Sequence, residues 1–581
     1  MSLLPVVLIS AVVLFLAYRG YGGLLSRLFR LDRNAETPAV RLRDDVDYVP
    51  IEPKFLFGQH FSAIAAAGPI VGPILAGVMF GWLPALLWIL IGSIFIGGVH
   101  DMGSLVASIR HRARSIAEVV REHMNRRSYV LFLIFIWITL VYIIAAFTDI
   151  VASSFVGRQT LEDGTVISGG GIATSSLLYL VLPIVMGLLL RTTRLSLRWA
   201  TVIFLPLVGV AIWAGPLMPF DLATLLGVDD ATAIKIWDVI LLVYCVIAAT
   251  VPMWLLLQPR GHLGGYFLLV ALIGGALGIL FGGKSIQYPA FIGWSTADGQ
   301  DLFPILFITI ACGACSGFHA LVSSGTSSRQ LRLETDAKPI GYGAMLMEAM
   351  VAVVSLGCVM MLAPDHSAVA GGSPKANLIY GLGMGSFLQV IGVPSTFAVS
   401  FALLAFTTFV YDTLDVGTRL GRYILQELTG WQGPCGRWVA TILTTGLPLL
   451  MMMQRLEDAA GRPLPAWRML WPLFGSCNQL LAALALLGVT VWLYRTRRAA
   501  WVWPVAGLPA LWMYLVSIWA LLGFVRRGFF TPSGSFVAFP ASALPWAALV
   551  LILLGLLLLA EAVPVLWRAT RQAAEAAPAT P

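Results

Sequence analysis

The sequence predicts an all-α integral membrane protein, a polytopic bundle of about fifteen transmembrane helices. Hydrophobic residues make up 59% of the 581 residues, and charged residues make up only 11%. A soluble domain carries roughly 25% charged residues, so this chain has too little polar surface to cover itself in water. The remaining apolar surface must face the lipid bilayer. The apolar runs are continuous rather than alternating, which indicates helices and excludes the strands of a membrane barrel.

Apolar runs that can cross about 30 Å of hydrocarbon follow one another along nearly the whole chain. They cover residues 2–18, 58–80, 82–108, 129–156, 173–190, 199–218, 235–257, 264–282, 302–324, 342–362, 386–411, 436–454, 468–493, 502–524 and 543–567. The first run lacks a preceding basic region and a small-residue cleavage site. We therefore expect it to remain in the protein as a helix rather than to act as a signal peptide.

The charges of the connecting segments predict the orientation. Basic residues gather in every second connection, as in 19–57, in 109–128 and at Arg260, and this excess is typical of cytoplasmic loops. The alternate connections are acidic or neutral, apart from 455–467 (with Arg455 and Arg462) and 525–542, and they include Glu162, Asp163 and Asp298. The pattern predicts an outside N-terminus and an inside C-terminus in an inner (plasma) membrane. Because the arginines are divided among short loops, the net charge of +8 does not indicate nucleic-acid binding.

No segment outside the apolar runs is long enough to bury a core of its own. We divide the chain into an N-terminal helix with a basic loop (1–57), a core with interrupted helices (58–454), additional C-terminal helices (455–567) and an Ala/Pro-rich tail (568–581). The composition of the tail predicts disorder.

The first candidate binding segment interrupts the run 58–80. Gly-Pro pairs at 68–69 and 72–73 lie near its middle, where proline cannot continue a helix. Inside a membrane a helix is interrupted only where protein or a polar cavity satisfies the freed backbone groups, and transporters bind solutes at such breaks. A structural kink is the alternative. The candidate substrate-binding residues of this run are Gln59, His60, Ser62, Gly68, Pro69 and Gly72.

The second candidate is the small-residue segment 311–320, which is followed by a series of hydroxyls at 323–328. Small residues permit close approach of helices. His319 lies at membrane depth, where an imidazole can relay a proton, and a packing role is the alternative. The residues assigned to solute or coupling ion are Ser316, Gly317, His319, Ser323 and Ser324.

Further candidates are polar or ionisable side chains inside apolar runs, where burial is costly without a function. Pro252 is expected to break the run 235–257, with Trp254 capping a pocket for substrate. Asp412 and Asp415 are expected to close the run 386–411, where anchoring at the cytoplasmic surface is the alternative. The candidate coupling residues of this group are Asp149, Glu348, Asp412, Asn478 and Gln479, and the two amides have helix–helix hydrogen bonding as their alternative.

The motifs of common enzymes are missing from the sequence. It holds no H-E-x-x-H, G-x-S-x-G, Walker A or kinase motif, so we expect no enzyme activity, and we expect an ion gradient rather than ATP to drive the protein. Cys312 and Cys315 form a single C-x-x-C pair among glycines, which indicates packing. We expect no cofactor and no metal.

The order of the runs is compatible with an inverted repeat. The runs 58–80 and 235–257 are five spans apart and cross in opposite directions, as a five-plus-five transporter core requires. The run 302–324 is seven spans from the first, so a seven-plus-seven arrangement remains open.

At several motifs the chain resembles the carbon starvation protein A family. These motifs are Phe57-Gly58-Gln59-His60-Phe61-Ser62, Gly282-Gly283-Lys284-Ser285-Ile286-Gln287, Cys315-Ser316-Gly317-Phe318-His319, Ala405-Phe406-Thr407-Thr408 before Asp412, and Phe474-Gly475-Ser476-Cys477-Asn478-Gln479. The resemblance extends over about residues 5–500. It implies a bacterial inner-membrane carrier induced in starvation, assigned to the uptake of peptides or of pyruvate with protons. It also implies similarity to the amino acid–polyamine–organocation superfamily, which favours the five-plus-five core.

The sequence therefore leads to the hypothesis of a secondary transporter for a small carboxylate-bearing nutrient with a coupling proton or sodium ion. The carboxylate is expected to bind the amides at the start of the half-helix after the 68–73 break. The coupled proton is expected on His60 or His319, together with Asp149 or Glu348. Two rivals remain open, namely an ion channel and a nutrient sensor that works with a partner kinase. The sequence does not choose between pyruvate and peptides, and it does not give the oligomeric state.

Overall fold

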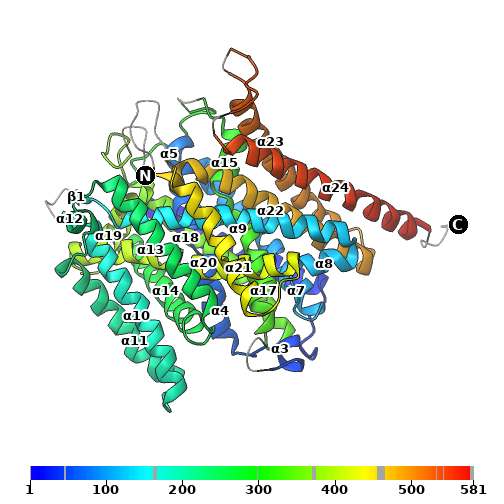
Figure 1. Ribbon diagram of the computed structural model, residues 1–581, viewed down its shortest axis with the longest axis horizontal. Coiled ribbons are helices and arrows are strands. Elements are labelled where there is room, and N and C mark those ends of the chain that lie inside the picture. Colours follow the sequence, from blue (N-terminus) through cyan, green and yellow to red (C-terminus); the bar gives the residue numbers. More distant parts are fainter. Residues whose placement is uncertain are drawn as a thin grey trace.

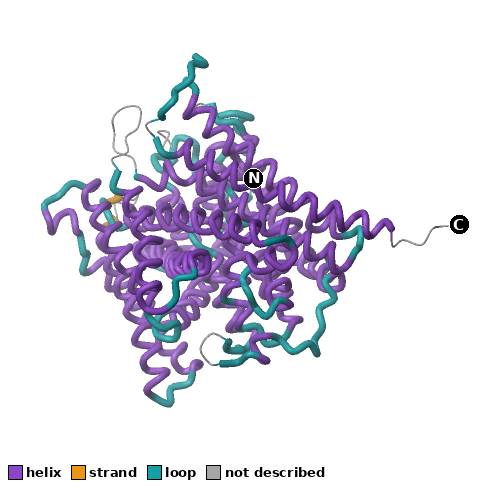
Figure 2. Tube along the Cα trace, turned by 45° about the vertical axis from the view of Figure 1, so that its right-hand side comes forward, coloured by secondary structure: helices purple, strands orange, loops and turns teal. Residues whose placement is uncertain are grey.

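Helices make up most of the described structure, which covers residues 2–44, 48–160, 166–296, 299–369, 375–454, 465–531, 533–540 and 542–575. In this computed structural model the helices pack side by side as one bundle (Figures 1 and 2). Glu162, Asp163, Asp298, Arg455 and Arg462, which the sequence places in outside loops, lie outside the described residues.

The helices in chain order are α1 (Leu3–Arg19), α2 (Tyr21–Leu28), α3 (Pro38–Arg41), α4 (Pro53–Ile64), α5 (Gly68–Phe80), α6 (Trp82–Gly92), α7 (Gly98–Arg110), α8 (Ile116–His123), α9 (Arg126–Ser154), α10 (Gly169–Thr192), α11 (Leu197–Ala214), α12 (Leu222–Leu226), α13 (Asp230–Thr250), α14 (Leu257–Phe281), α15 (Leu302–Thr309), α16 (Ala311–Ala314), α17 (Gly317–Gly325), α18 (Ala344–Met360), α19 (Ala376–Val390), α20 (Ser395–Thr429), α21 (Gly433–Met452), α22 (Ala466–Arg497), α23 (Leu508–Phe529) and α24 (Leu544–Glu575). The shorter helical turns are η1 (Ser93–Gly97), η2 (Gly215–Leu217), η3 (Ser327–Arg329), η4 (Glu334–Asp336), η5 (Lys338–Gly343) and η6 (Trp503–Gly507). The strands β1 (Arg158–Thr160) and β2 (Val166–Ser168) pair antiparallel, with Arg158 opposite Ser168.

The all-α membrane fold is confirmed, while the number of spans differs from the prediction. Among the described residues, thirteen helices are long and apolar enough to cross a membrane, and the bent pair α4–α5 makes fourteen. The remaining predicted span, 302–324, is divided among α15, α16 and α17, each too short to cross alone. The inverted repeat stays a prediction.

Burial separates the central helices from the peripheral ones. In α20 and α22, 94% of the most apolar 18-residue stretch is buried inside the protein, whereas in α11 the share is 33%. In Figure 1, α10 and α11 lie at one edge and α24 lies at the opposite edge, with α9, α18, α20 and α22 between them. The outer face of α11 exposes Trp199, Val202, Val210 and Trp213. Such a face is stable against lipid, so these edges mark the surface of a multi-pass membrane protein.

Connections predicted to share a side of the membrane contact one another. At one end, Leu3 N–H donates to the carbonyl of Lys284 (2.9 Å). At the other end, Arg495 donates to the carbonyl of His123 (2.6 Å), and Asn125 donates to Glu561 in the middle of α24 (2.6 Å). These contacts are compatible with the predicted topology, and the orientation in the membrane stays a prediction.

Three boundaries predicted from the sequence are wrong. Val251 is extended before Pro252, as residues before proline usually are, so α13 ends at Thr250 and Pro252 lies in the connection rather than inside a span. Arg260 consequently lies in the first turn of α14 and is fully buried, not in a cytoplasmic loop. Pro394 precedes the first turn of α20, so this helix runs from Ser395 to Thr429 and holds Asp412 at its middle rather than at its end.

The last helix also differs from the prediction of a disordered tail. It continues to Glu575, through the first residues of the segment 568–581, and residues 576–581 lie outside the described residues. The wider division of the chain into domains stays a prediction.

The contact between α5 and α15 predicts that Gly72 tolerates no larger residue. A Cβ atom at Gly72 would lie 2.4 Å from the carbonyl oxygen of Thr309, whereas a Cβ at Gly58 would meet nothing within 4 Å. We expect Gly72→Ala to destabilise the protein by roughly 1–3 kcal/mol, because backbone must move to make room. Thermal unfolding of the purified protein in detergent measures this, with Gly58→Ala as the matched control. Equal midpoints for the two variants would contradict the packing described here.

Candidate functional site

The first interrupted span bends by 45° between α4 and α5. Residues Ala65 to Ala67 form the break, and α5 begins at Gly68 with Pro69 in its first turn, where no backbone N–H is required. The second Gly-Pro pair does not interrupt the helix, contrary to the prediction, and Pro73 lies inside α5. Its missing N–H removes only one bond, to the carbonyl of Pro69 in that same first turn.

The second interrupted span breaks between α16 and α17. Cys315 (φ −165°, ψ 111°) and Ser316 (φ −111°, ψ 128°) are extended, and the side chain of Asn478 from α22 lies beside them. The Asn478 Oδ1 atom accepts the N–H of Phe318 (3.0 Å), and its Nδ2 donates to Ser316 Oγ (3.0 Å). Asn478 therefore supplies hydrogen-bond partners for groups that the break leaves without one. This is the role in hydrogen bonding between helices that was the alternative to ion coupling for this amide.

The two interrupted spans pack directly against each other. A Cβ atom at Gly68 would lie 2.1 Å from Cys312 Cβ, so only glycine fits at the start of α5. On the other side of α16, a Cβ at Gly317 would lie 2.5 Å from the backbone of Asn478. The structure thus brings together the segments that the sequence singled out separately.

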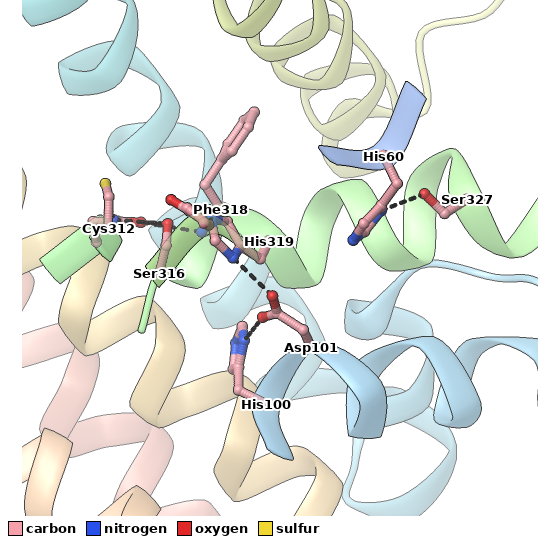
Figure 3. Close-up of polar contacts among 10 residues, drawn as sticks. His60, His100, Asp101, Cys312, Ser316, Phe318, His319 and Ser327 are labelled. Carbon is pink, nitrogen blue, oxygen red and sulfur yellow. Dashed lines mark hydrogen bonds and ion pairs between the residues drawn. The ribbon is translucent and has the colours of Figure 1, made fainter. Parts of the chain in front are cut away.

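His319 lies buried at this junction with a carboxylate at each ring nitrogen, and Figure 3 shows the one from Asp101. Its Nδ1 is 2.8 Å from Asp101 Oδ2, and its Nε2 is 3.3 Å from Glu348 Oε2. The other oxygen of Asp101 is 2.7 Å from His100 Nδ1, and the backbone of Ile64, at the end of α4, also interacts with His319. Two carboxylates and two imidazoles without solvent form a group that can gain or lose a proton by a small rearrangement.

Two polar residues of α4, His60 and Ser62, form hydrogen bonds with buried side chains outside the His319 group. His60 Nδ1 is 2.7 Å from Ser327 Oγ, beyond the end of α17 (Figure 3), and Ser62 Oγ hydrogen-bonds to Asp412 Oδ2. All four side chains are buried. Asp412 therefore belongs to the core rather than to the cytoplasmic surface, and the anchoring alternative is wrong.

Arg260 forms a second buried charge cluster that the sequence analysis missed. Its Nε is 2.9 Å from Asp412 Oδ1, and its Nη1 contacts both Asp415 Oδ2 and the hydroxyl of Tyr244. Tyr244 in turn donates to Asp415 (2.8 Å). Pro252 was the signal in the sequence that could have revealed this cluster, because it indicates that the helix ends before residue 252. With α13 ending at Thr250, the connection is complete by Leu256 and Arg260 lies inside α14.

A small cavity lies between these groups. It has a volume of about 20 Å³, and it is lined by Gln59, His60, Ala63, Leu257, Gly261, Thr326, Ser327, Asp412 and Val416. One water needs roughly 10–15 Å³ of such space, so the cavity has room for a water but for no organic solute. The core is therefore closed in this conformation.

Three predicted site residues lie apart from both clusters. Asp149 accepts the backbone N–H of Trp467 (2.8 Å) at the start of α22, and Gln479 faces Met513 Sδ on α23 (3.2 Å). Trp254 stacks under Arg191, with 4.3 Å from the guanidinium carbon to the ring centre. Ser323 and Ser324 follow His319 on α17, and Ser324 Oγ already accepts the N–H of Ile116 (3.1 Å).

A multi-pass bundle with two interrupted helices around buried ionisable groups has the architecture of a membrane transporter. The family model of the carbon starvation protein CstA matches residues 2–376 and 368–520. The chain belongs to this family, and it is a transporter of the carbon starvation family.

Characterised relatives cover most of the chain. A peptide transporter CstA of Escherichia coli (strain K12) is 33% identical over 89% of this chain and 80% of its own. The pyruvate/proton symporter BtsT of the same strain is 33% identical over 90% of this chain and 81% of its own. A peptide transporter CstA of Bacillus subtilis (strain 168) is 30% identical over 97% of both chains.

Among solved structures, a mutant manganese transporter of Eremococcus coleocola matches 92% of this chain and 99% of its own, at 16% identity and a TM-score of 0.44. The same transporter in complex with an aromatic bis-isothiourea substituted compound matches at 15% identity with the same coverage and TM-score. A likeness at this level carries no conclusion about what this chain transports.

The Arg260 cluster predicts a strong effect on stability. Arg260→Met leaves two carboxylates buried without their cation, and we expect a loss of roughly 3–5 kcal/mol. The triple change Arg260→Met, Asp412→Asn and Asp415→Asn removes the unpaired charges, so it should recover much of that loss. Thermal unfolding in detergent measures both, with Arg191→Met, at an exposed arginine, as control. A midpoint for Arg260→Met as high as that of the control would contradict a buried ion pair.

Proposed function

We propose that this protein is a secondary active transporter that imports a small carboxylate-bearing nutrient across the bacterial inner membrane with a proton. The observation that carries the proposal is His319, which lies between Asp101 and Glu348 where the two interrupted spans meet. The relatives named as a peptide transporter and a pyruvate/proton symporter support a nutrient of this class. Expression during nutrient starvation belongs to the same proposal.

The proton is assigned to the His319 group. A protonated imidazole can donate to Asp101 and to Glu348 at once, and a neutral one satisfies only one of them, so each protonation state favours a different arrangement of α7, α17 and α18. The backbone of Ile64 joins the break of α4–α5 to the same group. Sodium coupling remains the alternative, and the Ser323 hydroxyl, buried without a partner among the described residues, lies one turn from His319.

The solute is assigned to the junction of the two interrupted spans, between the start of α5 and the segment 311–320. A carboxylate there would face the amino end of α5, where the helix dipole favours an anion. Gly68 and Cys312 fill this junction in the closed conformation, so binding requires that α5 and α16 separate. The residues proposed to line the open site are Gln59, His60, Ser62, Gly68, Pro69, Gly72, Ser316 and Gly317.

The first test removes the proton-carrying ring. In proteoliposomes with an inward proton gradient, His319→Gln should reduce accumulation of labelled pyruvate or dipeptide by roughly tenfold or more, because glutamine keeps a hydrogen-bond donor at this position and cannot carry the proton. Exchange of substrate without a gradient should persist, which shows that the variant is folded. The control is His262→Gln, at a buried histidine that contacts Thr201 and neither cluster. Gradient-driven accumulation equal to that of the control would contradict the assignment.

The second test identifies the nutrient. In a deletion strain that carries this gene, labelled pyruvate uptake is measured against unlabelled pyruvate, dipeptides and amides of both. A carboxylate ligand at the amino end of α5 predicts competition by free carboxylates and none by the amides. Competition by the amides as strong as by the acids would remove the carboxylate from the proposal.

A further inference from the structure

A cluster of two histidines and a glutamate lies outside the transport core, on the predicted cytoplasmic side. His111 follows the last residue of α7, and Glu122 and His123 end the short helix α8. The Nε2 atoms of the two histidines are 2.8 Å apart, and Glu122 Oε1 is 3.9 Å from His111 Nε2. One ligand atom from each side chain lies within 4.8 Å of the others.

The orientation of His111 leaves a lone pair on the shared side. Its Nδ1 lies 2.6 Å from the carbonyl oxygen of Ala107, one turn earlier in α7, and this bond places the ring proton on Nδ1. The Nε2 atom is therefore an acceptor. Metal-binding histidines are commonly oriented by such a bond from the second nitrogen to a backbone carbonyl.

The protein fixes the position of both rings. The side chain of His111 is 8% exposed and lies edge-on against Trp492 of α22. The carbonyl of His123 accepts a hydrogen bond from Arg495 (2.6 Å), and the first residue of α8, Ile116, donates to Ser324 Oγ (3.1 Å). The helices thus hold the Nε2 atoms of His111 and His123 close together. Without a metal ion, the two imidazoles can share only one proton between these atoms.

We propose that His111, Glu122 and His123 bind a divalent transition metal of the zinc class, with water at the fourth position. Two nitrogens that share a zinc ion at 2.0–2.1 Å with tetrahedral geometry lie about 3.3 Å apart. The histidine pair needs a small separation to reach that spacing, and the largely exposed Glu122 needs a small approach. Imidazole nitrogens with one carboxylate are a usual donor set for zinc, and the carboxylate offsets part of the charge of the ion.

A metal at this position would join the end of α7 to the end of α8. The helix α7 carries Asp101, and α8 is hydrogen-bonded at its start to Ser324 on α17, the helix that carries His319. The ion would thus restrain the predicted cytoplasmic ends of the helices that hold the His319 group. This site is independent of the proposed substrate, because none of its three side chains lies in the core.

The test uses the purified full-length protein, freed of metal with a chelator and carrying no polyhistidine tag. Zinc is titrated by competition with an indicator dye, and cobalt is added to report coordination by its absorption spectrum. We expect one equivalent of either metal, and His111→Gln or His123→Gln should weaken binding by at least roughly tenfold to 100-fold. Zinc should also slow hydrogen exchange of the backbone amides of residues 111–124 in the unsubstituted protein.

The controls separate a built site from incidental binding. His262→Gln, at a buried histidine far along the chain, should leave the stoichiometry and affinity unchanged. Glu122→Gln should weaken binding while keeping the helix, which addresses a possible loss of fold in the histidine variants. Binding that is equal in the unsubstituted protein and in the double variant His111→Gln, His123→Gln would overturn the proposal. So would zinc that leaves exchange at 111–124 unchanged.

Discussion

The pairing of His319 with two buried carboxylates is the constraint on which the core depends. Inside a membrane bundle an ionisable side chain is stable only with a partner, and both Asp101 and Glu348 lie within ion-pair distance of this one ring. Small residues make the meeting possible, because Gly317 lets α17 lie against the backbone of α22 and Gly68 lets α5 lie against α16. The interruption of α16 and α17 then turns the imidazole toward α7 and α18, and Asn478 satisfies the backbone that the interruption exposes.

The helix α4 joins this group to a second one. Its last residue, Ile64, interacts with His319, while Ser62 bonds to Asp412 in the Arg260 cluster and His60 bonds to Ser327. A displacement of α4 therefore changes the surroundings of both charge clusters at once. The cavity beside His60 and Asp412 has room for about one water, so an organic solute requires such a displacement. Because one helix contacts both clusters, this arrangement supports the proposed coupling between proton and solute.

The sequence was sufficient for the class of fold and for part of the site, and the reasons are physical. Continuous apolarity and loop charges identify membrane helices without tertiary information, and Gly68-Pro69, Glu348 and His319 stand out because polar or helix-breaking residues are costly in lipid. The sequence failed at Arg260, whose charge was attributed to a loop, although Pro252 marked the true helix end. It also failed at Pro73, which lies inside α5 without ending that helix. No periodicity could reveal that Asp101 faces His319, because that contact joins residues 218 positions apart.

The most direct test of the account is the balance point between substrate and proton gradients in proteoliposomes. Vesicles are loaded with substrate, the proton gradient is set by buffers, and the gradient at which net flux is zero is measured. A symporter that moves one proton with each substrate predicts a tenfold larger substrate gradient at balance for every added pH unit at zero membrane potential, by equality of the two free energies. A balance point that does not move with the pH gradient would contradict proton coupling and, with it, the role given to His319.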